Sequence, residues 1–371
     1  MTNNLYKTIE VKTNNTQYPI IIGKNSLHQL EEFIKDGKKY SKIFIITDEN
    51  VYKLHFTKLN NIINKINIAS HFLITEASEK SKSFSNLEKI CEEIISLNPD
   101  RKSLIIAFGG GVVGDLSGFI ASILLRGIDF IQLPTTLLAS VDSSVGGKTA
   151  INSKFGKNLI GSFCQPKLVI CDTDLLSTLP IRDLRSGYAE ILKYGLISDK
   201  IFFHFLEKNY HKIFSLEEEV LKETIFKSCE IKARIVEIDE KEQNIRALLN
   251  FGHSFGHLFE TETNYSNEIL HGEAVALGIA MASKMSLNFD LINIDEYQQI
   301  IKHLKIAGFI IEPKKIRNVW SVENLTSSLY RDKKVENNSL TFILLESIGK
   351  AIIKKNVNIE HFQRVMNDFL N

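Results

Sequence analysis

One segment of the chain carries four polar residues at the spacing of a single helix face. Arg246, Asn250, His253 and His257 follow one another at intervals of three or four residues, so on a helix they would form one stripe. Two histidines with an arginine and an asparagine are hard to bury in a dry core, because each polar group needs a partner. The stripe is therefore expected to face water, a metal ion or a ligand. It lacks the glutamate of the zinc-protease motif H-E-x-x-H, since a serine follows His253.

Two further segments supply groups that could complete a metal site. His271 and Glu273 stand at the start of one helix-like segment, and Glu190 lies on another with Lys193. One carboxylate and two histidines form a typical catalytic zinc set, which leaves a fourth position for water or substrate. The predicted ligands are Glu190, His253 and His271. The alternative for Glu190 and Lys193 is an ordinary surface ion pair between residues three apart on a helix.

Three glycines indicate a phosphate-binding turn. Gly109, Gly111 and Gly114 form a G-x-G-x-x-G motif between a strand-like and a helix-like segment. In that context the backbone can approach a pyrophosphate, and the helix N-terminus carries partial positive charge. The motif departs from the usual dinucleotide fingerprint, because the acidic residue expected about 20 residues later is missing. Asp48, which ends an earlier strand-like run, could bind the ribose instead; the structural alternative is a glycine-rich turn without a ligand.

A second segment partly matches the phosphate-binding motif G-x-x-x-x-G-K-[ST]. Residues 147–149 fit its end, but Asp142 stands where the first glycine belongs. A carboxylate at that place and a helix-like lead argue against a nucleoside triphosphatase. Lys148 is instead expected to form an anion site with Lys157 and Asn158. The alternative is a solvated basic loop.

The first half of the chain has the pattern of a parallel sheet. Apolar, β-branched runs of strand length recur at 42–49, 70–76, 103–110, 129–134 and 167–172. Helix-like segments lie between them, at 85–98 and 112–127. This alternation predicts an α/β domain with a mostly parallel, doubly wound sheet.

The second half is expected to be mainly helical. Apolar residues recur at three- and four-residue spacing in 186–208, 216–238, 246–262, 271–289 and 296–307. Lys232 lies on an otherwise apolar helix face, where extension of its amine to solvent is the alternative to a role in a site. We therefore expect an α/β domain over 1–183 and a mainly α-helical domain over 184–371, with a binding cleft between them.

Composition limits the class of protein. The 371 residues are 44% hydrophobic and 24% charged, which is typical of a globular chain of two domains. A net charge of +1 lacks the cationic excess of a nucleic-acid-binding protein. The four cysteines form no C-x-x-C motif, and we find neither a targeting segment nor a membrane-spanning stretch. We expect a cytoplasmic protein with no membrane or nucleic-acid partner.

Six segments, in this order and spacing, resemble the 3-dehydroquinate synthase family of the sugar phosphate cyclase superfamily. They are GGGVVGD, LPTTLLASVDSSVGGKTAIN, GKNLIG, GYAEILKYG, RALLNFGHSFGH and LHGEAVALG. The resemblance implies an NAD-binding α/β domain, a mainly helical metal- and substrate-binding domain, and a homodimer. It also implies NAD+ and Zn²⁺ (or Co²⁺) as cofactors, and a lyase of the shikimate pathway to chorismate and the aromatic amino acids.

The resemblance assigns roles to individual residues. It gives the metal to Glu190, His253 and His271. NAD contacts fall on Asp48, Glu79, Lys82, Gly111, Val112, Val113, Gly114, Asp115, Thr135, Thr136, Lys148, Lys157, Leu175, Leu176, Ser177 and Thr178. Substrate contacts fall on Arg126, Asp142, Lys148, Lys157, Asn158, Lys193, Lys232, Arg246, Asn250, His257, His271 and Lys333 or Lys334. Catalysis falls on His257, Glu242, Lys148, Arg246 and Asn250.

One NAD-binding segment departs from the family pattern. The usual D-G-E-x-x-K appears as ASEKSK at 77–82, which keeps Glu79 and Lys82 but loses the Asp-Gly turn. This departure concerns the geometry of the local loop and not the chemistry.

The reaction implied by the resemblance converts 3-deoxy-D-arabino-heptulosonate 7-phosphate to 3-dehydroquinate and phosphate. It comprises transient oxidation at C5, β-elimination of phosphate, reduction and an aldol cyclisation. Three alternatives remain at this point: a sugar phosphate cyclase of secondary metabolism, a metal-dependent glycerol or alcohol dehydrogenase, and a binding protein that has lost activity. The basic cluster favours a phosphorylated substrate over simple hydride exchange.

Overall fold

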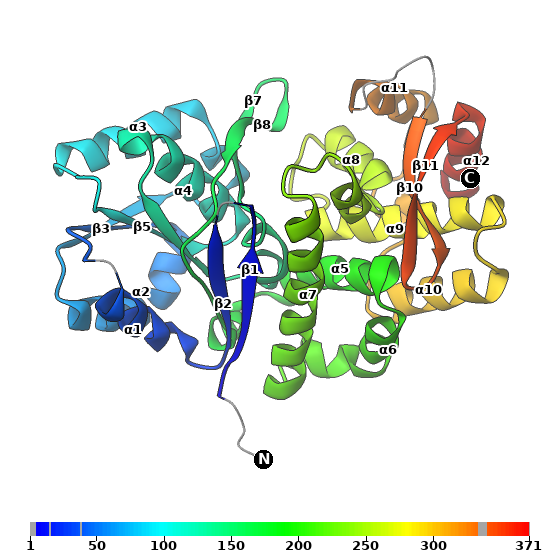
Figure 1. Ribbon diagram of the computed structural model, residues 1–371. Coiled ribbons are helices and arrows are strands. Elements are labelled where there is room, and N and C mark those ends of the chain that lie inside the picture. Colours follow the sequence, from blue (N-terminus) through cyan, green and yellow to red (C-terminus); the bar gives the residue numbers. More distant parts are fainter. Residues whose placement is uncertain (1–4, 15, 38, 333–339, 371) are drawn as a thin grey trace. The chain divides into compact units, whose positions relative to one another are not determined.

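The computed structural model describes residues 5–14, 16–37, 39–332 and 340–370 (Figure 1). The chain forms two compact units, of which the first comprises Met1–Pro180 and Leu216–Lys241 and the second Ile181–Ser215 and Glu242–Asn371. The chain thus leaves the first unit three residues before the boundary expected from the sequence, and it returns there for one helix.

The first unit is built on a seven-stranded sheet. In spatial order the strands are β1 (Lys7–Lys12), β2 (Gln17–Gly23), β9 (Val169–Asp172), β6 (Asp129–Pro134), β5 (Leu104–Gly109), β3 (Ile43–Asp48) and β4 (Ser70–Thr75). All neighbours are parallel except β1 and β2, which are antiparallel. The five predicted strands are confirmed.

Helices cover both faces of this sheet, because its central strands are apolar on both sides. In β3, Ile43 and Ile45 pack with helices α1 (Gln29–Asp36) and α2 (Glu49–Ile66). Phe44 and Ile46 point to the opposite face and pack with α3 (Phe84–Ser96) and α4 (Gly111–Ile123) (Figure 1). The alternation of side chains along a strand therefore supplies two hydrophobic layers from one apolar run.

The glycine motif lies at the point where the strand order reverses. The chain passes from β3 to β4 on one side and then crosses to β5 on the other side of β3. Ligands of open α/β sheets bind outside the carboxyl ends of the strands at such a point. β5 ends at Gly109 and α4 begins at Gly111. A Cβ on Gly109 would lie 2.6 Å from the Val113 side chain, so the tight turn requires glycine there.

Two hairpins of the first unit were not expected, and the predicted helix over 216–238 belongs to this unit and not to the second. The strands β7 (Lys148–Ser153) and β8 (Gly156–Phe163) form an antiparallel hairpin, and β1 with β2 forms a second. The helix α7 (Glu218–Ile238) packs against β1 and β2, although it follows two helices of the other unit in sequence.

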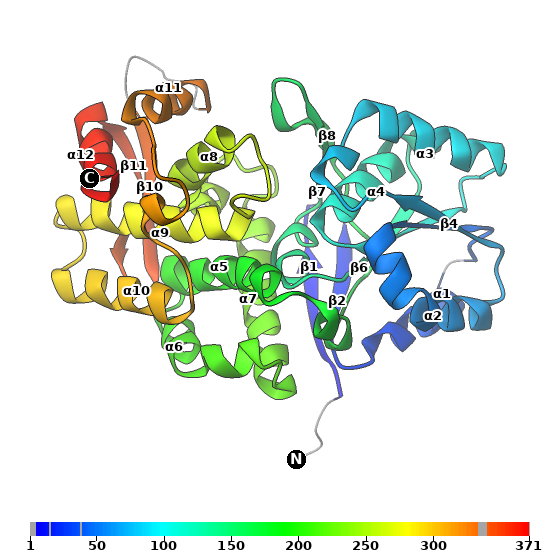
Figure 2. The same ribbon diagram turned by 180° about the vertical axis from the view of Figure 1, so that it is seen from behind.

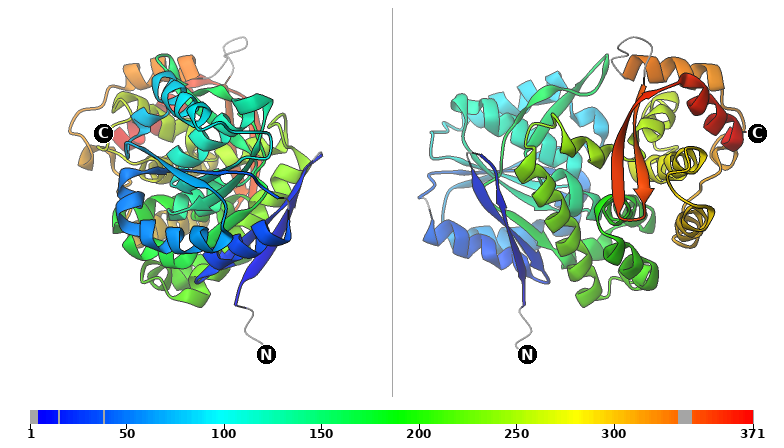
Figure 3. Two further views of the ribbon diagram at one scale, coloured as in Figure 1. Left: turned by 90° about the vertical axis from the view of Figure 1, so that its left-hand side faces the viewer. Right: turned by 45° about the vertical axis from the view of Figure 1, so that its right-hand side comes forward.

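The second unit is mainly helical, as predicted. Its helices are α5 (Ile181–Ser198), α6 (Lys200–Phe214), α8 (His253–Glu262), α9 (His271–Asn288), α10 (Ile294–Ile306), α11 (Val322–Asp332) and α12 (Ile359–Leu370). Helix α9 is central and contacts α5, α8, α10 and α12 (Figure 2). A two-stranded sheet of β10 (Leu340–Ser347) and β11 (Lys350–Val357) lies beside α12 (Figure 3).

Two predicted helices of this unit are wrong in their continuity. The segment 186–208 spans α5 and α6, because Asp199 ends one helix and caps the next by accepting a hydrogen bond from the Phe202 amide. The segment 246–262 is likewise interrupted, as described below. Within the described part of the chain, no helix is long and apolar enough to cross a lipid bilayer.

Candidate metal and cofactor sites

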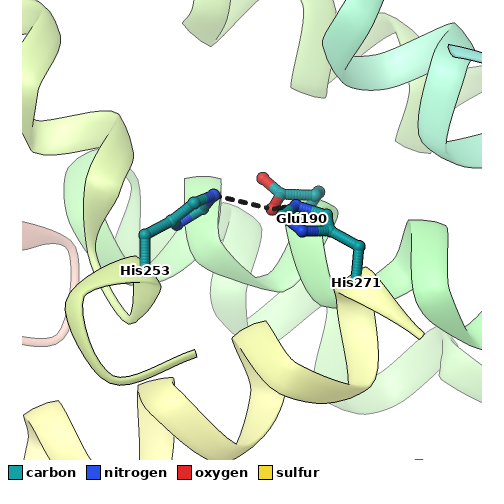
Figure 4. Close-up of side chains that lie close together, drawn as sticks. All are labelled: Glu190, His253 and His271. Carbon is teal, nitrogen blue, oxygen red and sulfur yellow. Dashed lines mark ion pairs between the residues drawn. The ribbon is translucent and has the colours of Figure 1, made fainter. Parts of the chain in front are cut away.

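Three helices of the second unit bring one carboxylate and two imidazoles together. Glu190 lies within α5, whereas His253 and His271 are the first residues of α8 and α9. Their possible ligand atoms all lie within 4.8 Å of one another (Figure 4). Glu190 Oε1 is 3.5 Å from Nε2 of His253 and 3.5 Å from Nε2 of His271. The structure therefore assembles the three residues predicted as metal ligands.

The orientation of both imidazoles fits a bound divalent cation. His253 Nδ1 lies 3.3 Å from the Phe251 carbonyl oxygen, and His271 Nδ1 lies 3.4 Å from both carboxylate oxygens of Glu260. With Nδ1 facing an acceptor, each ring presents Nε2 towards Glu190. Metal-binding histidines are held in this way, with the second ring nitrogen donating to a carbonyl or a carboxylate. One carboxylate with two imidazoles suits zinc or cobalt.

Burial and charge act differently on the two histidines. Burial lowers the pKa of His253 to about 3, and the neighbouring Lys193 ammonium contributes. For His271 burial acts in the same direction, but the carboxylates of Glu260 and Glu190 outweigh it and raise the pKa to about 10. His253 is therefore neutral near pH 7, with its lone pair available to a metal.

The pair of Glu190 and Lys193 is not a surface ion pair. The Glu190 side chain is 0% exposed and that of Lys193 is 2% exposed. Lys193 Nζ donates to Glu190 Oε2, so the other carboxylate oxygen, Oε1, faces the two imidazoles. The alternative considered for this pair from the sequence is excluded by its burial.

The polar stripe does not lie on one helix, which corrects the sequence prediction. Arg246 and Asn250 belong to a short 3-10 helix (Ile245–Asn250), and α8 begins only at His253. Gly252 separates the two with φ 81°, and a Cβ there would lie 2.9 Å from the Ile279 amide of α9. The close approach to α9 therefore breaks the helix at this glycine.

The residues of the stripe nevertheless stay near the ligand cluster or are fixed by neighbours. The His257 ring centroid is 5.3 Å from that of His253 and 6.5 Å from that of His271. Asn250 Nδ2 donates to Glu242 Oε1 at 2.8 Å. Arg246 is 2% exposed, which is rare for an arginine. The second unit thus holds the predicted ligands together with a further imidazole.

In the first unit, the predicted NAD residues lie at the carboxyl ends of the strands or in the loops that follow. Asp48 ends β3 and caps α2 by accepting hydrogen bonds from the Asn50 and Val51 amides, both at 3.0 Å. Residues 111–115 form the first turn of α4. Thr135 and Thr136 follow β6, and residues 175–178 follow β9 in a 3-10 helix.

A second polar cluster joins three segments of the first unit. Lys82 Nζ donates to Asp115 Oδ2 at 2.6 Å and also to the side-chain oxygen of Asn158. Glu79 accepts a hydrogen bond of 2.8 Å from Asn152, whose own side-chain oxygen accepts from the Asn158 amide at 3.0 Å. Burial raises the pKa of Asp115, and Lys82 opposes this shift. Four predicted residues converge here, and two of them, Glu79 and Lys82, also line a cavity of about 850 Å³. Asn152, which links Glu79 to Asn158, is a member of this cluster that the sequence did not single out.

The departure at ASEKSK is accommodated by serines. Ser78 accepts a hydrogen bond from the Lys80 amide and begins a one-turn 3-10 helix (Glu79–Ser81). Ser81 Oγ donates to the Glu76 carbonyl oxygen at 2.7 Å. The loop therefore presents both Glu79 and Lys82 to the cluster without the Asp-Gly turn.

Asp142 and Lys232 form a third polar contact. Lys232 Nζ donates to the side-chain and backbone oxygens of Asp142, both at 2.6 Å, and the lysine is 5% exposed. Extension of this amine to solvent is therefore excluded. Asp142 lies in a π-helical turn (Ala139–Ser143), which confirms the helix-like lead before Lys148.

The remaining candidates lie on the hairpin, at an exposed turn or beyond the described residues. Lys148 and Lys157 lie on the β7–β8 hairpin, and Arg126 is exposed with φ 69°. Lys333 and Lys334 lie outside the described residues.

The sequence matches two family models over most of its length. Residues 72–186 match the model of the 3-dehydroquinate synthase N-terminal region, and residues 187–335 match that of the C-terminal region. The chain belongs to the 3-dehydroquinate synthase family. Its resemblance to this family, expected from the six segments, is confirmed, and with it an enzyme of the lyase class.

Curated relatives of this family are similar over nearly the whole chain. The 3-dehydroquinate synthase of Bartonella quintana is 48% identical over 361 residues, which cover 95% of this chain and 96% of the relative. That of Thermoanaerobacter pseudethanolicus is 44% identical and covers 93% of this chain and 95% of the relative. The match therefore includes both units.

Solved structures of related cyclases share the fold. A 2-deoxy-scyllo-inosose synthase in complex with carbaglucose-6-phosphate, NAD+ and Co²⁺ aligns with a TM-score of 0.88 at 25% identity, covering 98% of this chain and all (100%) of that one. The 2-epi-5-epi-valiolone synthase of Streptomyces hygroscopicus, with NAD+ and Zn²⁺ bound, aligns with a TM-score of 0.85 at 23% identity, covering 96% and 98%. The alcohol dehydrogenase of Thermococcus thioreducens aligns at 0.69 and 16% identity, covering 97% and 98%, which shows the fold alone.

Proposed function

We propose that this chain converts 3-deoxy-D-arabino-heptulosonate 7-phosphate to 3-dehydroquinate and phosphate, with NAD+ and a divalent metal as cofactors. The observation that carries the proposal is the cluster of Glu190, His253 and His271 in a chain 48% identical to the curated 3-dehydroquinate synthase of Bartonella quintana. The related cyclases are only 23–25% identical, so their substrates are less favoured. The reaction would serve the shikimate pathway.

The metal ion would be held by Glu190, His253 and His271. Zn²⁺ or Co²⁺ bound there would act as a Lewis acid that lowers the pKa of a substrate hydroxyl. The ligand residues would orient that hydroxyl, and the buried Lys193 would hold the Glu190 carboxylate in place by donating to it. The same ammonium could also contact a substrate oxygen, because lysine has three donors.

NAD+ would bind at the sheet reversal, with its pyrophosphate over residues 111–115. Asp48, Thr135, Thr136 and residues 175–178 would form the rest of this site, because they follow the neighbouring strands. Bound NAD+ would accept a hydride and return it within one turnover. In this proposal residues 1–183 would bind NAD, and residues 184–371 would bind the metal and the substrate. Lys232 is among the substrate-binding residues, although its helix α7 belongs to the first compact unit.

Cationic side chains would bind the substrate phosphate and carboxylate. The candidates are Arg126, Lys148, Lys157, Lys193, Lys232 and Arg246. A dianionic phosphate and a carboxylate need several charge-assisted hydrogen bonds, which a chain of net charge +1 must supply by local clustering. Asp142 would keep the Lys232 ammonium in place by its two contacts.

Proton movement would fall to His257, with Glu242 and Asn250 in support. His257 lies beside the ligand imidazole of His253 without being part of the ligand set. Glu242 accepts a hydrogen bond from the side-chain amide of Asn250, and this contact fixes the orientation of that amide. A histidine is suited to transfer a proton near neutral pH.

We also propose that the protein is a homodimer and that it acts in the cytoplasm.

The decisive experiment measures phosphate release and NADH together. Purified protein is incubated with the heptulosonate phosphate, Zn²⁺ or Co²⁺, and NAD+ below the substrate concentration. We expect one phosphate for each substrate lost, many turnovers for each NAD+, and NADH no higher than the enzyme concentration. Steady accumulation of NADH would favour a dehydrogenase, and preferred turnover of another sugar phosphate would favour a different cyclase.

A further inference from the structure

Glu260 is a buried carboxylate outside the residue set assigned above. It lies on α8, two residues before the end of that helix, and is 4% exposed. Burial of an ionised carboxylate is unfavourable unless charged or hydrogen-bonding groups compensate for it. The groups that contact the Glu260 carboxylate therefore indicate its role.

The carboxylate of Glu260 faces the ring of His271. Oε1 and Oε2 each lie 3.4 Å from His271 Nδ1, while Nε2 on the opposite side of the ring lies 3.5 Å from Glu190 Oε1. The imidazole thus lies between two carboxylates. A proton on Nδ1 can be shared between the two oxygens of Glu260, which leaves the lone pair of Nε2 on the side of Glu190.

The two imidazoles of the cluster differ in their second partner. Nδ1 of His253 faces a neutral backbone carbonyl, that of Phe251, at 3.3 Å, whereas Nδ1 of His271 faces a carboxylate. A carboxylate accepts a stronger hydrogen bond than a carbonyl and makes the imidazole a better electron donor. His271 is therefore the imidazole whose strength as a ligand depends on a side chain that mutation can change.

Helix packing holds this arrangement in place. Glu260 is seven residues after His253 on α8, so both side chains project from the same face of that helix. The helix α9, which begins with His271, packs directly against α8. One helix therefore supplies a ligand and also the carboxylate that orients a second ligand on its neighbour.

We propose that Glu260 is a positioning residue that fixes the tautomer and ring orientation of His271 for a divalent cation. This inference rests on the proposed metal site. It assigns Glu260 no contact with substrate and no part in proton transfer. Its effect is on the affinity for the metal and on the geometry around it.

The test measures metal affinity in matched variants. Zn²⁺ is titrated into the metal-free protein in competition with a chromophoric chelator, for the wild type, Glu260→Gln and Glu260→Ala. We expect the affinity to fall about 10-fold for Glu260→Gln, which keeps the shape but loses the charge, and up to about 100-fold for Glu260→Ala. The control is Glu262→Gln on the same helix, whose carboxylate contacts Ser328 Oγ at 3.4 Å and not the cluster. It should bind Zn²⁺ as the wild type does.

A spectroscopic measurement separates positioning from a general loss of structure. The d–d absorption of bound Co²⁺ reports its coordination, so the band should change for Glu260→Gln and stay unchanged for Glu262→Gln. Circular dichroism of the metal-free proteins should be the same. Equal Zn²⁺ affinity and an unchanged Co²⁺ spectrum in Glu260→Gln would overturn the inference while leaving the metal site in place. No uptake of Zn²⁺ or Co²⁺ by the wild type would overturn the metal site itself.

Discussion

Arg182 and Glu273 form a bidentate ion pair that joins the beginnings of two helices. Arg182 Nε and Nη2 each lie 2.7 Å from a carboxylate oxygen of Glu273. The same arginine donates to the carbonyl oxygens of Asn267 at 3.0 Å and Glu268 at 3.1 Å. Glu273 in turn accepts a hydrogen bond of 2.8 Å from the Leu270 amide. The pair therefore holds the loop immediately before the first residue of α9 to the start of α5.

Removal of this pair should lower stability locally. We expect Arg182→Ala to reduce the free energy of unfolding by about 1 kcal/mol, because a bidentate pair that also binds two carbonyls and supports a helix cap is lost. Urea unfolding followed by circular dichroism measures the change. Lys315→Ala, which breaks an exposed pair with Glu312, should leave the midpoint unchanged. Equal effects of both variants would contradict a special role for Arg182.

The two histidines of H-x-x-x-H should differ in their effect on metal content. Chelation should abolish turnover, and added Zn²⁺ or Co²⁺ should restore it. His253→Ala should lose the metal, because it removes one of the three proposed protein ligands. His257→Ala should retain the metal and lose turnover rate. Metal analysis of the purified variants distinguishes them, and equal metal loss in both would show that the roles of the two residues are confused.

The hairpin lysine Lys148 should contribute to substrate binding and not to folding. Lys148 is exposed at the start of β7, so its removal leaves the core intact. We expect Lys148→Ala to lower kcat/KM for the phosphorylated substrate, because the variant loses about 2–4 kcal/mol of transition-state stabilisation. The matched control is Lys154→Ala, an exposed lysine of the same hairpin. An equal loss in both variants would indicate a general electrostatic effect.

Acid should destabilise the second unit through His303. This residue is 1% exposed, its Nε2 lies 2.8 Å from the Tyr188 hydroxyl, and burial lowers its pKa to about 4. The unfolded state, with a histidine pKa near 6.5, binds the proton more readily between these values, so stability is highest above about pH 6.5 and falls as the pH drops towards 4. We expect a loss of about 2 kcal/mol between pH 7.5 and pH 5 from this group.

His303→Phe provides the comparison for this effect. The variant lacks the titrating group, so its stability should depend less steeply on pH over the same interval, although the hydrogen bond to Tyr188 is also lost. Denaturant unfolding at both pH values gives the difference for each protein. An identical pH dependence in wild type and variant would refute the assignment to His303.

Local sequence patterns determined much of the architecture. The central strands could be predicted because apolar, β-branched runs such as 103–110 have a composition that suits a sheet buried on both faces. The grouping of Glu190, His253 and His271 as candidate metal ligands could be predicted from residue types, since one carboxylate and two imidazoles form a typical zinc set. The glycine turn was recognisable because a tight approach of backbone to a helix leaves a signature in the sequence.

Only the tertiary structure decided the features that depend on contacts between distant segments. The helical stripe breaks at Gly252 because α9 approaches the backbone there, and no local pattern contains that neighbour. The helix α7 belongs to the first unit because it packs on β1 and β2, two strands that lie near the other end of the sequence. The contact of Glu260 with His271 also depends on packing, because it joins two different helices, α8 and α9. Side-chain types determine which chemistry is possible, whereas long-range packing determines which groups meet.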